Sequence, residues 1–148
     1  MNFFSGDLSY QHGMGSGGDP DAFREKIINS IMGGVRSYDN GGGLMPLGAA
    51  LHTLGDTYAP SHTARDDDFN ITRYQDYNAQ NSKKHKEGDQ KDKNLKQYQK
   101  AVNALTDFLN DVCDKSCSLE DIADNLRNGP LRHSIEGVKV VGSHKDYK

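Results

Sequence analysis

The stretch LKQYQKAVNALTDFLNDV, residues 95–112, carries the clearest secondary-structure pattern in this chain. Its apolar side chains recur every three or four positions, at Leu95, Tyr98, Val102, Leu105, Leu109 and Val112. That spacing places them on one face of an α-helix, because a helix turns once in about 3.6 residues. We therefore predict an amphipathic helix here, and we expect its apolar face to pack in the core rather than against a partner.

Three further helices are predicted, two before this one in the chain and one after it. The first begins at Asp19-Pro20, where an acidic cap precedes a proline at the first helical position. The second begins near Met45-Pro46, and the third opens with the capping-box pattern of residues 118–121. Gly129-Pro130 should end the third helix, because glycine favours a helix end and proline cannot continue one.

The remaining segments are polar. Residues 63–93 are rich in charge, with a short apolar and aromatic group at residues 69–77. The tail has one apolar run, residues 138–141, which is either a strand or a packed arm. At 148 residues the chain has room for one domain, residues 1–148. We predict an all-α fold, a compact bundle of four to five helices around a metal site with long polar loops.

The composition excludes some classes of protein. No run approaches the ~20 apolar residues of a membrane-spanning helix, so no transmembrane segment is expected. The N-terminus lacks the basic region and apolar stretch of a signal peptide, and we expect a soluble protein. A formal net charge of −3 argues against nonspecific binding of polyanions by bulk electrostatics. The two cysteines, Cys113 and Cys117, are spaced for either a local disulfide or two free thiols, and both readings stay open.

The segment LHTLGDTYAPSH, residues 51–62, combines histidine and aspartate in a pattern that favours a metal site. His52 and Asp56 are four positions apart, so on a helix they share one face. His62 follows a proline that can turn the chain back toward them, and His85 and Asp89 repeat the same spacing. A single pair of this kind is usually an ion pair, whereas two pairs with an intervening histidine suit zinc, which binds imidazole and carboxylate ligands.

The pattern HxxxDxxxPxH at residues 52–62, followed by HxxxD at residues 85–89, resembles the signature of a known superfamily. That superfamily joins the bacterial zinc-dependent phospholipases C with the zinc nucleases of the single-strand-cleaving type. The resemblance covers about residues 10–90, and it implies an all-helical fold and a zinc cluster that hydrolyses phosphodiesters. The 23-residue step from His62 to His85 and the acid Asp89 are similar to the nuclease branch.

The resemblance also implies which residues bind metal. His12 precedes a predicted helix in the place of an upstream histidine of the family. One zinc ion would then be held by His62, His85 and Asp89, and a second by His12, His52 and Asp56. The family's N-terminal tryptophan has no counterpart, because this chain contains no Trp. We therefore expect a domain truncated at its N-terminus relative to the family, with two zinc ions and no third.

The expected chemistry follows from two metal ions, which can clamp a phosphoryl group and hold a hydroxide between them. Asp56 would act both as a ligand and as a proton acceptor. Arg65 would bind a phosphate oxygen through its forked guanidinium, or would be a surface arginine paired with the acids of residues 66–68. His133 and Glu136 lie outside the matched region, and we expect them in solvent or at a helix end.

The predicted function is that of a zinc-dependent phosphodiester hydrolase acting on nucleic acid or on phospholipid headgroup esters, and the two substrates stay open. Small domains with such motifs also resemble the C-terminal toxin domains of bacterial polymorphic toxins. This resemblance implies a cognate immunity protein as partner. It also implies a place in the bacterial cytoplasm before export, then secretion or delivery as a toxin module. The alternative function is a non-catalytic metal-binding or interaction domain that has lost the family's N-terminal ligands.

Overall fold

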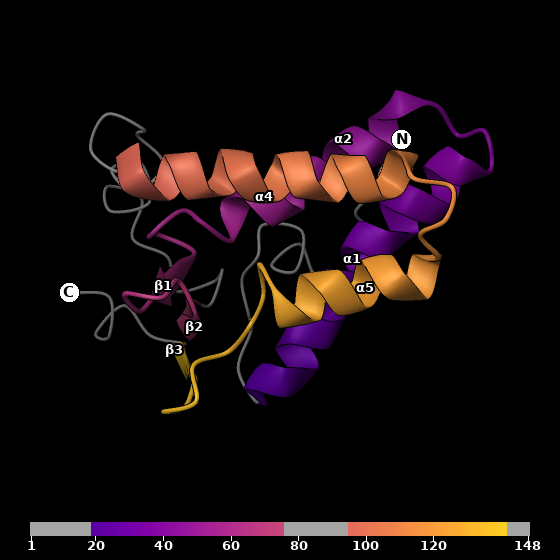
Figure 1. Cartoon of the computed structure of the whole chain (residues 1–148). Coiled ribbons are helices and arrows are strands. Elements are labelled where there is room, and N and C mark those ends of the chain that lie inside the picture. Colours follow the sequence, from indigo (N-terminus) through magenta and orange to yellow (C-terminus); the bar gives the residue numbers. More distant parts are fainter. Residues whose placement is uncertain (1–18, 76–94, 142–148) are drawn as a thin grey trace.

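A computed structural model describes residues 19–75 and 95–141 of the chain (Figure 1). The described elements follow the order α1 (Pro20–Asp39), α2 (Leu44–Asp56), β1 (Thr63–Arg65), β2 (Ile71–Gln75), α4 (Leu95–Cys113), α5 (Leu119–Asn128) and β3 (Lys139–Val141). The described chain is therefore mostly helical, as predicted, but it also contains a small three-stranded sheet. The expectation of a purely all-α fold is wrong in that respect.

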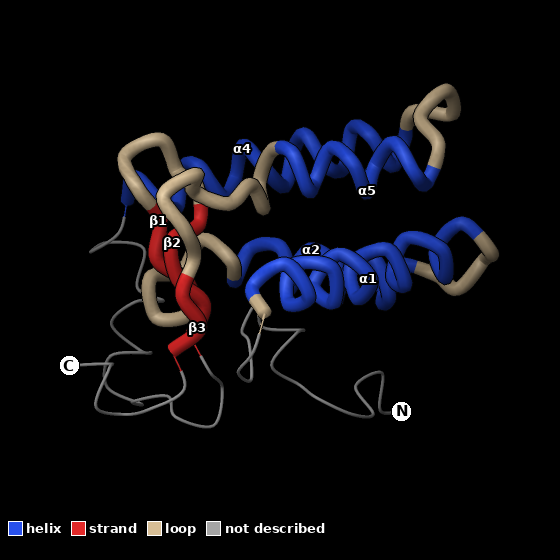
Figure 2. The backbone as a smooth tube through the Cα atoms, turned by 90° about the horizontal axis from the view of Figure 1, so that it is seen from below, coloured by secondary structure: helices blue, strands red, loops and turns tan. Residues whose placement is uncertain are grey.

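The helices form two layers beside the sheet. Figure 2 shows α1 and α2 side by side in one layer, α4 and α5 in the other, and the strands at one end. Helix α4 packs against α2, and α5 packs against α1. The core between the layers is built mainly from the apolar face of α1, which buries Phe23, Ile27, Ile28, Ile31, Met32 and Val35.

Helix starts follow the sequence signals. The side chain of Asp19 accepts a hydrogen bond from the backbone N–H of Asp21 at 3.0 Å, and Pro20 occupies the first turn of α1. At α5, Ser118 and Asp121 form the predicted capping box, each side chain accepting from the backbone N–H of the other. These caps satisfy N–H groups that have no partner within the helix.

Close contact between α1 and α2 depends on one small residue. A Cβ atom at Gly34 would lie 2.4 Å from the carbonyl oxygen of Pro46 and 3.0 Å from the Cβ of Ala50. Both distances are shorter than a normal contact, so only glycine permits this approach. Leu47, Ala50 and Leu54 of α2 then reach the core against α1.

Helix α4 is buried unevenly along its length. Its second half supplies the buried Ala104 and Phe108, together with partly buried side chains at Leu105, Leu109 and Val112. In its first half, Leu95, Tyr98 and Val102 are 57%, 44% and 42% exposed. The expectation that the whole apolar face packs in the core is therefore wrong for the first two turns, where α4 extends past α2 and α5 (Figure 1).

The sheet has the order β1-β2-β3. Strands β1 and β2 are antiparallel, with Ala64 opposite Arg73, and β2 and β3 are parallel, with Arg73 opposite Lys139. Of the two possibilities for the apolar run at residues 138–141, a strand is therefore the one the structure shows. No helix in the described part of the chain is long and apolar enough to cross a membrane.

Candidate functional site

The predicted pair His52 and Asp56 lies on one face of α2 near the end of the helix. The His52 Nε2 and Asp56 Oδ2 atoms are 3.2 Å apart, as the four-residue spacing predicts. The His52 side chain is 59% exposed and that of Asp56 is 18% exposed. One nitrogen and one oxygen donor therefore meet at the molecular surface, where a ligand could reach them.

His62 lies in a different environment, immediately before β1. A series of turns follows α2, in which the His62 N–H donates to the Ala59 carbonyl at 2.9 Å. The His62 carbonyl accepts from the Gln75 N–H at 2.9 Å, which extends the β1–β2 pairing by one residue. Only 1% of His62 is exposed, so its imidazole is enclosed in the protein while that of His52 is open.

The described residues supply only part of the predicted metal centre. Within residues 19–75 and 95–141, no group of three or more His, Cys, Asp or Glu side chains is arranged to hold a metal ion. The other three predicted ligands, His12, His85 and Asp89, lie outside the described residues. The donors that are described, two imidazoles and a carboxylate, suit zinc in kind. The two-zinc centre therefore stays a prediction.

Arg65 binds the protein itself rather than a site open to a substrate. Its Nε and Nη2 atoms donate to the Thr57 carbonyl at 3.1 and 3.0 Å, and Nη2 also reaches the Thr57 hydroxyl at 3.1 Å. Its Nη1 donates to the carbonyls of Phe69 and Pro130, both at 2.7 Å. A guanidinium has five N–H donors, and these contacts use all five.

The surroundings of Arg65 confirm this structural role. The guanidinium carbon lies 3.9 Å from the centre of the Tyr58 ring, a cation–π contact. Burial lowers the pKa of Arg65 from its ordinary value. Its donors face oxygens of three separate segments, and Asp66 acts on it through charge alone, which raises its pKa. This use of the Arg65 donors within the protein differs from both sequence-based interpretations of the residue.

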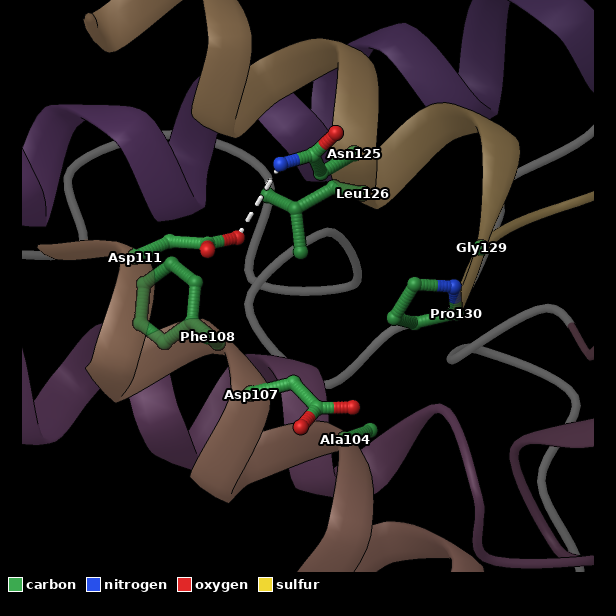
Figure 3. A pocket seen from close by; sticks show the side chains of 8 residues that line it. All are labelled: Ala104, Asp107, Phe108, Asp111, Asn125, Leu126, Gly129 and Pro130. Carbon is green, nitrogen blue, oxygen red and sulfur yellow. Dashed lines mark hydrogen bonds between the residues drawn. The ribbon is translucent and has the colours of Figure 1, made fainter. Parts of the chain in front are cut away.

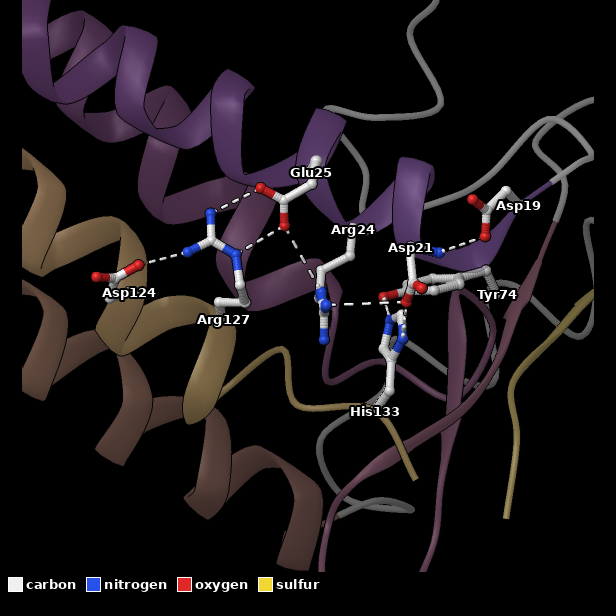
Figure 4. A network of polar contacts seen from close by, with 8 residues as sticks. All are labelled: Asp19, Asp21, Arg24, Glu25, Tyr74, Asp124, Arg127 and His133. Atoms are coloured by element: carbon white, nitrogen blue, oxygen red, sulfur yellow. Dashed lines mark hydrogen bonds and ion pairs between the residues drawn. The ribbon is translucent and has the colours of Figure 1, made fainter. Parts of the chain in front are cut away.

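A second polar cluster joins α1 to the sheet (Figure 4). The Tyr74 hydroxyl and His133 Nε2 are 2.7 Å apart, and His133 Nδ1 lies 3.2 Å from Asp21 Oδ1. Burial is the main cause that lowers the pKa of His133, and the positive charge of Arg24 lowers it further. The expectation that His133 lies in solvent or at a helix end is wrong, because its side chain is only 11% exposed.

The same face of α1 is tied to α5 by an arginine. Arg127 donates to both carboxylate oxygens of Glu25, at 2.8 and 2.6 Å, and also to Asp124 at 2.5 Å (Figure 4). The hydrogen bond from Arg127 lowers the pKa of Glu25. This cluster holds two helices together, and sequence spacing gave no signal for it because the partners are 102 residues apart.

A cavity of about 270 Å3 lies between α4 and α5 (Figure 3). Its walls include the apolar Phe108, Leu126 and Pro130, and Asp107 and Asp111 lie at its edge. Asp111 accepts a hydrogen bond from Asn125 at 3.1 Å. Two carboxylates would repel a phosphodiester, so this cavity does not support the predicted activity. Cys113, which is exposed, and Cys117, which is partly buried, form no disulfide in the structure.

Comparison of the chain with protein-family models, with curated proteins and with solved structures finds no match.

Proposed function

We propose that this protein is a zinc-dependent phosphodiester hydrolase that cleaves nucleic acid or phospholipid headgroup esters. The observation that supports the proposal is the His52–Asp56 pair, whose Nε2 and Oδ2 atoms are 3.2 Å apart on the exposed end of α2. This pair presents one nitrogen and one oxygen donor together, and the enclosed imidazole of His62 follows directly after the helix. The donor types are those of hydrolytic zinc sites.

In this proposal His52, Asp56 and His12 hold one zinc ion, and His62, His85 and Asp89 hold the other. Bound zinc lowers the pKa of a water molecule to about 7 and so supplies hydroxide at neutral pH. Asp56, which is mostly but not fully enclosed, accepts a proton during the reaction. His52 positions the Asp56 carboxylate through the contact between its Nε2 atom and Asp56 Oδ2.

The resemblance to toxin domains extends the proposal to a role as a bacterial effector with a cognate immunity protein. Delivery to a target cell, and not only activity in solution, would then be part of its function. This part rests on the sequence pattern alone. It would be supported by protection of cells that co-express a dedicated inhibitor.

A non-catalytic metal-binding domain is the second candidate. The observation that favours it is that His52 and Asp56 contact each other at 3.2 Å across one helical turn. A His–Asp pair by itself is also a common surface ion pair on a helix. The two candidate functions differ in turnover and not in metal content. An experiment that separates them must therefore measure both zinc content and hydrolysis.

The test combines metal analysis with hydrolysis of bis(4-nitrophenyl) phosphate by the full chain. We expect about two zinc ions per chain, and we expect His52→Ala and Asp56→Asn each to lower turnover at least about 100-fold, since even residues that only support metal ligands cost 10–100-fold. The unfolding midpoint of His52→Ala should stay close to that of the wild type, because the side chain is 59% exposed. Single-stranded DNA and phosphatidylcholine vesicles then separate the two substrate classes.

Two exposed residues outside α2 serve as controls. Asp67→Asn removes an exposed carboxylate in the β1–β2 turn, and Asn103→Ala truncates an exposed residue of α4. Both should keep full zinc content and turnover. Stoichiometric zinc without hydrolysis would support the binding domain instead, and a wild-type chain that holds no zinc would contradict both candidates.

A further inference from the structure

Two cationic side chains lie directly opposite each other in the sheet. Arg73 of β2 and Lys139 of β3 are register partners in the parallel pair. Register partners project from the same face of a sheet, so the two positive charges are neighbours. Like charges in this arrangement destabilise a sheet. Their placement therefore calls for a compensating negative charge.

The backbone of Arg73 is paired within the sheet, but its side-chain Nε atom is buried without a hydrogen-bond partner. A buried donor in this state typically costs about 1–3 kcal/mol. Native proteins pair nearly all such groups, and an exception indicates a water, an ion or a functional role. At Arg73 the missing partner is an acceptor, and the neighbouring Lys139 favours one with negative charge.

The space beside these residues can admit a ligand. A hollow of about 530 Å3 is lined by Arg73, Lys139, Val140 and Val141. Lys139 is exposed and Arg73 is partly buried, so an anion could enter from solvent and meet both cations. The two valines lower the local polarity, which strengthens the attraction between opposite charges.

The register relates this hollow to the candidate metal ligand His62. Thr63 is opposite Tyr74 and Ala64 is opposite Arg73, so His62, which accepts from the Gln75 N–H, is opposite Gln75. Gln75 and Arg73 are two residues apart in β2 and share a face, because side chains alternate along a strand. His62 and Arg73 are therefore separated by about 7 Å along one face of the sheet.

We infer that Arg73 and Lys139 form the subsite that binds the phosphate group of a phosphodiester substrate. This inference rests on the proposed function, and it assigns to Arg73 the role that Arg65 cannot fill. The planar guanidinium of Arg73 binds two phosphate oxygens at once, and the ammonium of Lys139 adds a second positive charge. The shared chemistry is a phosphodiester monoanion, whether it belongs to a nucleic acid or to a lipid headgroup.

The test measures binding separately from turnover. Dimethyl phosphate, a thymidine dinucleotide and glycerophosphocholine are titrated into the full-length protein as purified, with the dissociation constants obtained from NMR shift changes. We expect Arg73→Gln to weaken binding of dimethyl phosphate at least about tenfold, a loss of about 1.4 kcal/mol. Lys139→Gln should weaken it several-fold. Tighter binding of the dinucleotide or of glycerophosphocholine then identifies the source of the phosphate.

The controls remove the same charges elsewhere. Arg36→Gln at the end of α1 and Lys115→Gln in the turn after α4 are both exposed, and we expect each to bind as the wild type does. Equal affinity in Arg73→Gln, Lys139→Gln and the wild type would overturn the subsite. Arg73-dependent binding without hydrolysis would keep the subsite and contradict the enzyme, whereas hydrolysis with an unchanged KM in Arg73→Gln would contradict the subsite and keep the enzyme.

Discussion

Two arginines in neighbouring strands of one sheet have opposite surroundings. Arg65, at the end of β1, uses all five N–H donors on backbone and hydroxyl oxygens of the protein. Arg73, in the middle of β2, has a buried side-chain Nε atom without a hydrogen-bond partner. N–H donors that already bind oxygens of the protein cannot bind a substrate unless those hydrogen bonds break. The contrast therefore separates a structural arginine from one that is available to a ligand.

The backbone explains why the two positions differ. A β-bulge between Ala64 and Arg65 interrupts the pairing of β1 with β2, and Phe69 in the following turn has a positive φ of 63°. The carbonyl groups of Thr57, Phe69 and Pro130 lie outside regular strand pairing, so they need other donors. Arg65 supplies them. Arg73 also borders this register shift, but its backbone is paired with Ala64 of β1 on one side and with Lys139 of β3 on the other.

The largest effect should come from Arg65→Ala. The change leaves the carbonyls of Phe69 and Pro130 without their donor, and we expect the free energy of unfolding to fall by about 3 kcal/mol. Urea unfolding followed by circular dichroism measures this loss. Arg65→Lys should recover only part of it, since an ammonium cannot reproduce the forked geometry. A loss below about 0.5 kcal/mol, the range of ordinary surface substitutions, would show that Arg65 and Arg73 do not differ as described.

An intermediate effect is expected where His133 connects β2 to α1. Tyr74→Phe removes the hydrogen bond to His133 Nε2, and we expect a loss of about 1 kcal/mol in the free energy of unfolding. Urea unfolding at pH 7.5 measures it. Phe23→Leu, which keeps an apolar side chain beside the Tyr74 ring but leaves the hydroxyl in place, is the comparison for altered packing alone. Equal stability of Tyr74→Phe and the wild type would show that the hydroxyl contributes nothing.

The pH dependence of that region has a defined sign. Burial and Arg24 lower the pKa of His133 from 6.5, whereas Asp21 opposes the shift. The unfolded chain therefore binds the proton more readily than the folded protein. The stabilising contribution is complete above pH 6.5 and is lost as the pH falls through the pKa of folded His133. Urea unfolding between pH 8 and 5 should show this loss in the wild type and a smaller one in His133→Gln. A rise in stability over that range would contradict the assignment.

The smallest effect on stability should come from Arg73→Met. The change removes a buried donor that has no partner and relieves the repulsion from Lys139. We expect the free energy of unfolding to stay within about 0.5 kcal/mol of the wild type or to rise. Thermal unfolding without added phosphate measures it. A loss of more than 1 kcal/mol would place Arg73 with Arg65 among the structural residues and remove the basis of the comparison.

Local sequence signals predicted the helices well. The proline at the start of α1, the capping box of α5 and the apolar repeat of α4 each depend on residues within one or two turns, and the structure confirms all three. The same holds for His52 and Asp56, whose contact follows from their spacing on one helix. Such features can be predicted from the sequence because the interactions that cause them are between residues close together in the chain.

The sheet and the roles of Arg65 and His133 could not be predicted in this way. Strands β1 and β3 have three residues each, too few for a repeat, and β3 pairs with a strand more than 60 residues earlier in the sequence. Pro130 and Tyr74, the partners that define Arg65 and His133, are 65 and 59 residues away. Nothing near Arg65 or His133 in the sequence identifies these partners.

The sequence by itself therefore determined the helices, their caps and the donor pair on α2, because helical geometry is fixed by neighbours within four residues. Only the tertiary structure decided which arginine is enclosed by carbonyl oxygens and which faces Lys139 across the sheet. The physical reason is that hydrogen-bond donors are assigned by proximity in space. At Arg65 the segments after α2, β1 and α5 bring the carbonyl oxygens of Thr57, Phe69 and Pro130 within reach of the guanidinium, whereas no acceptor reaches Nε of Arg73.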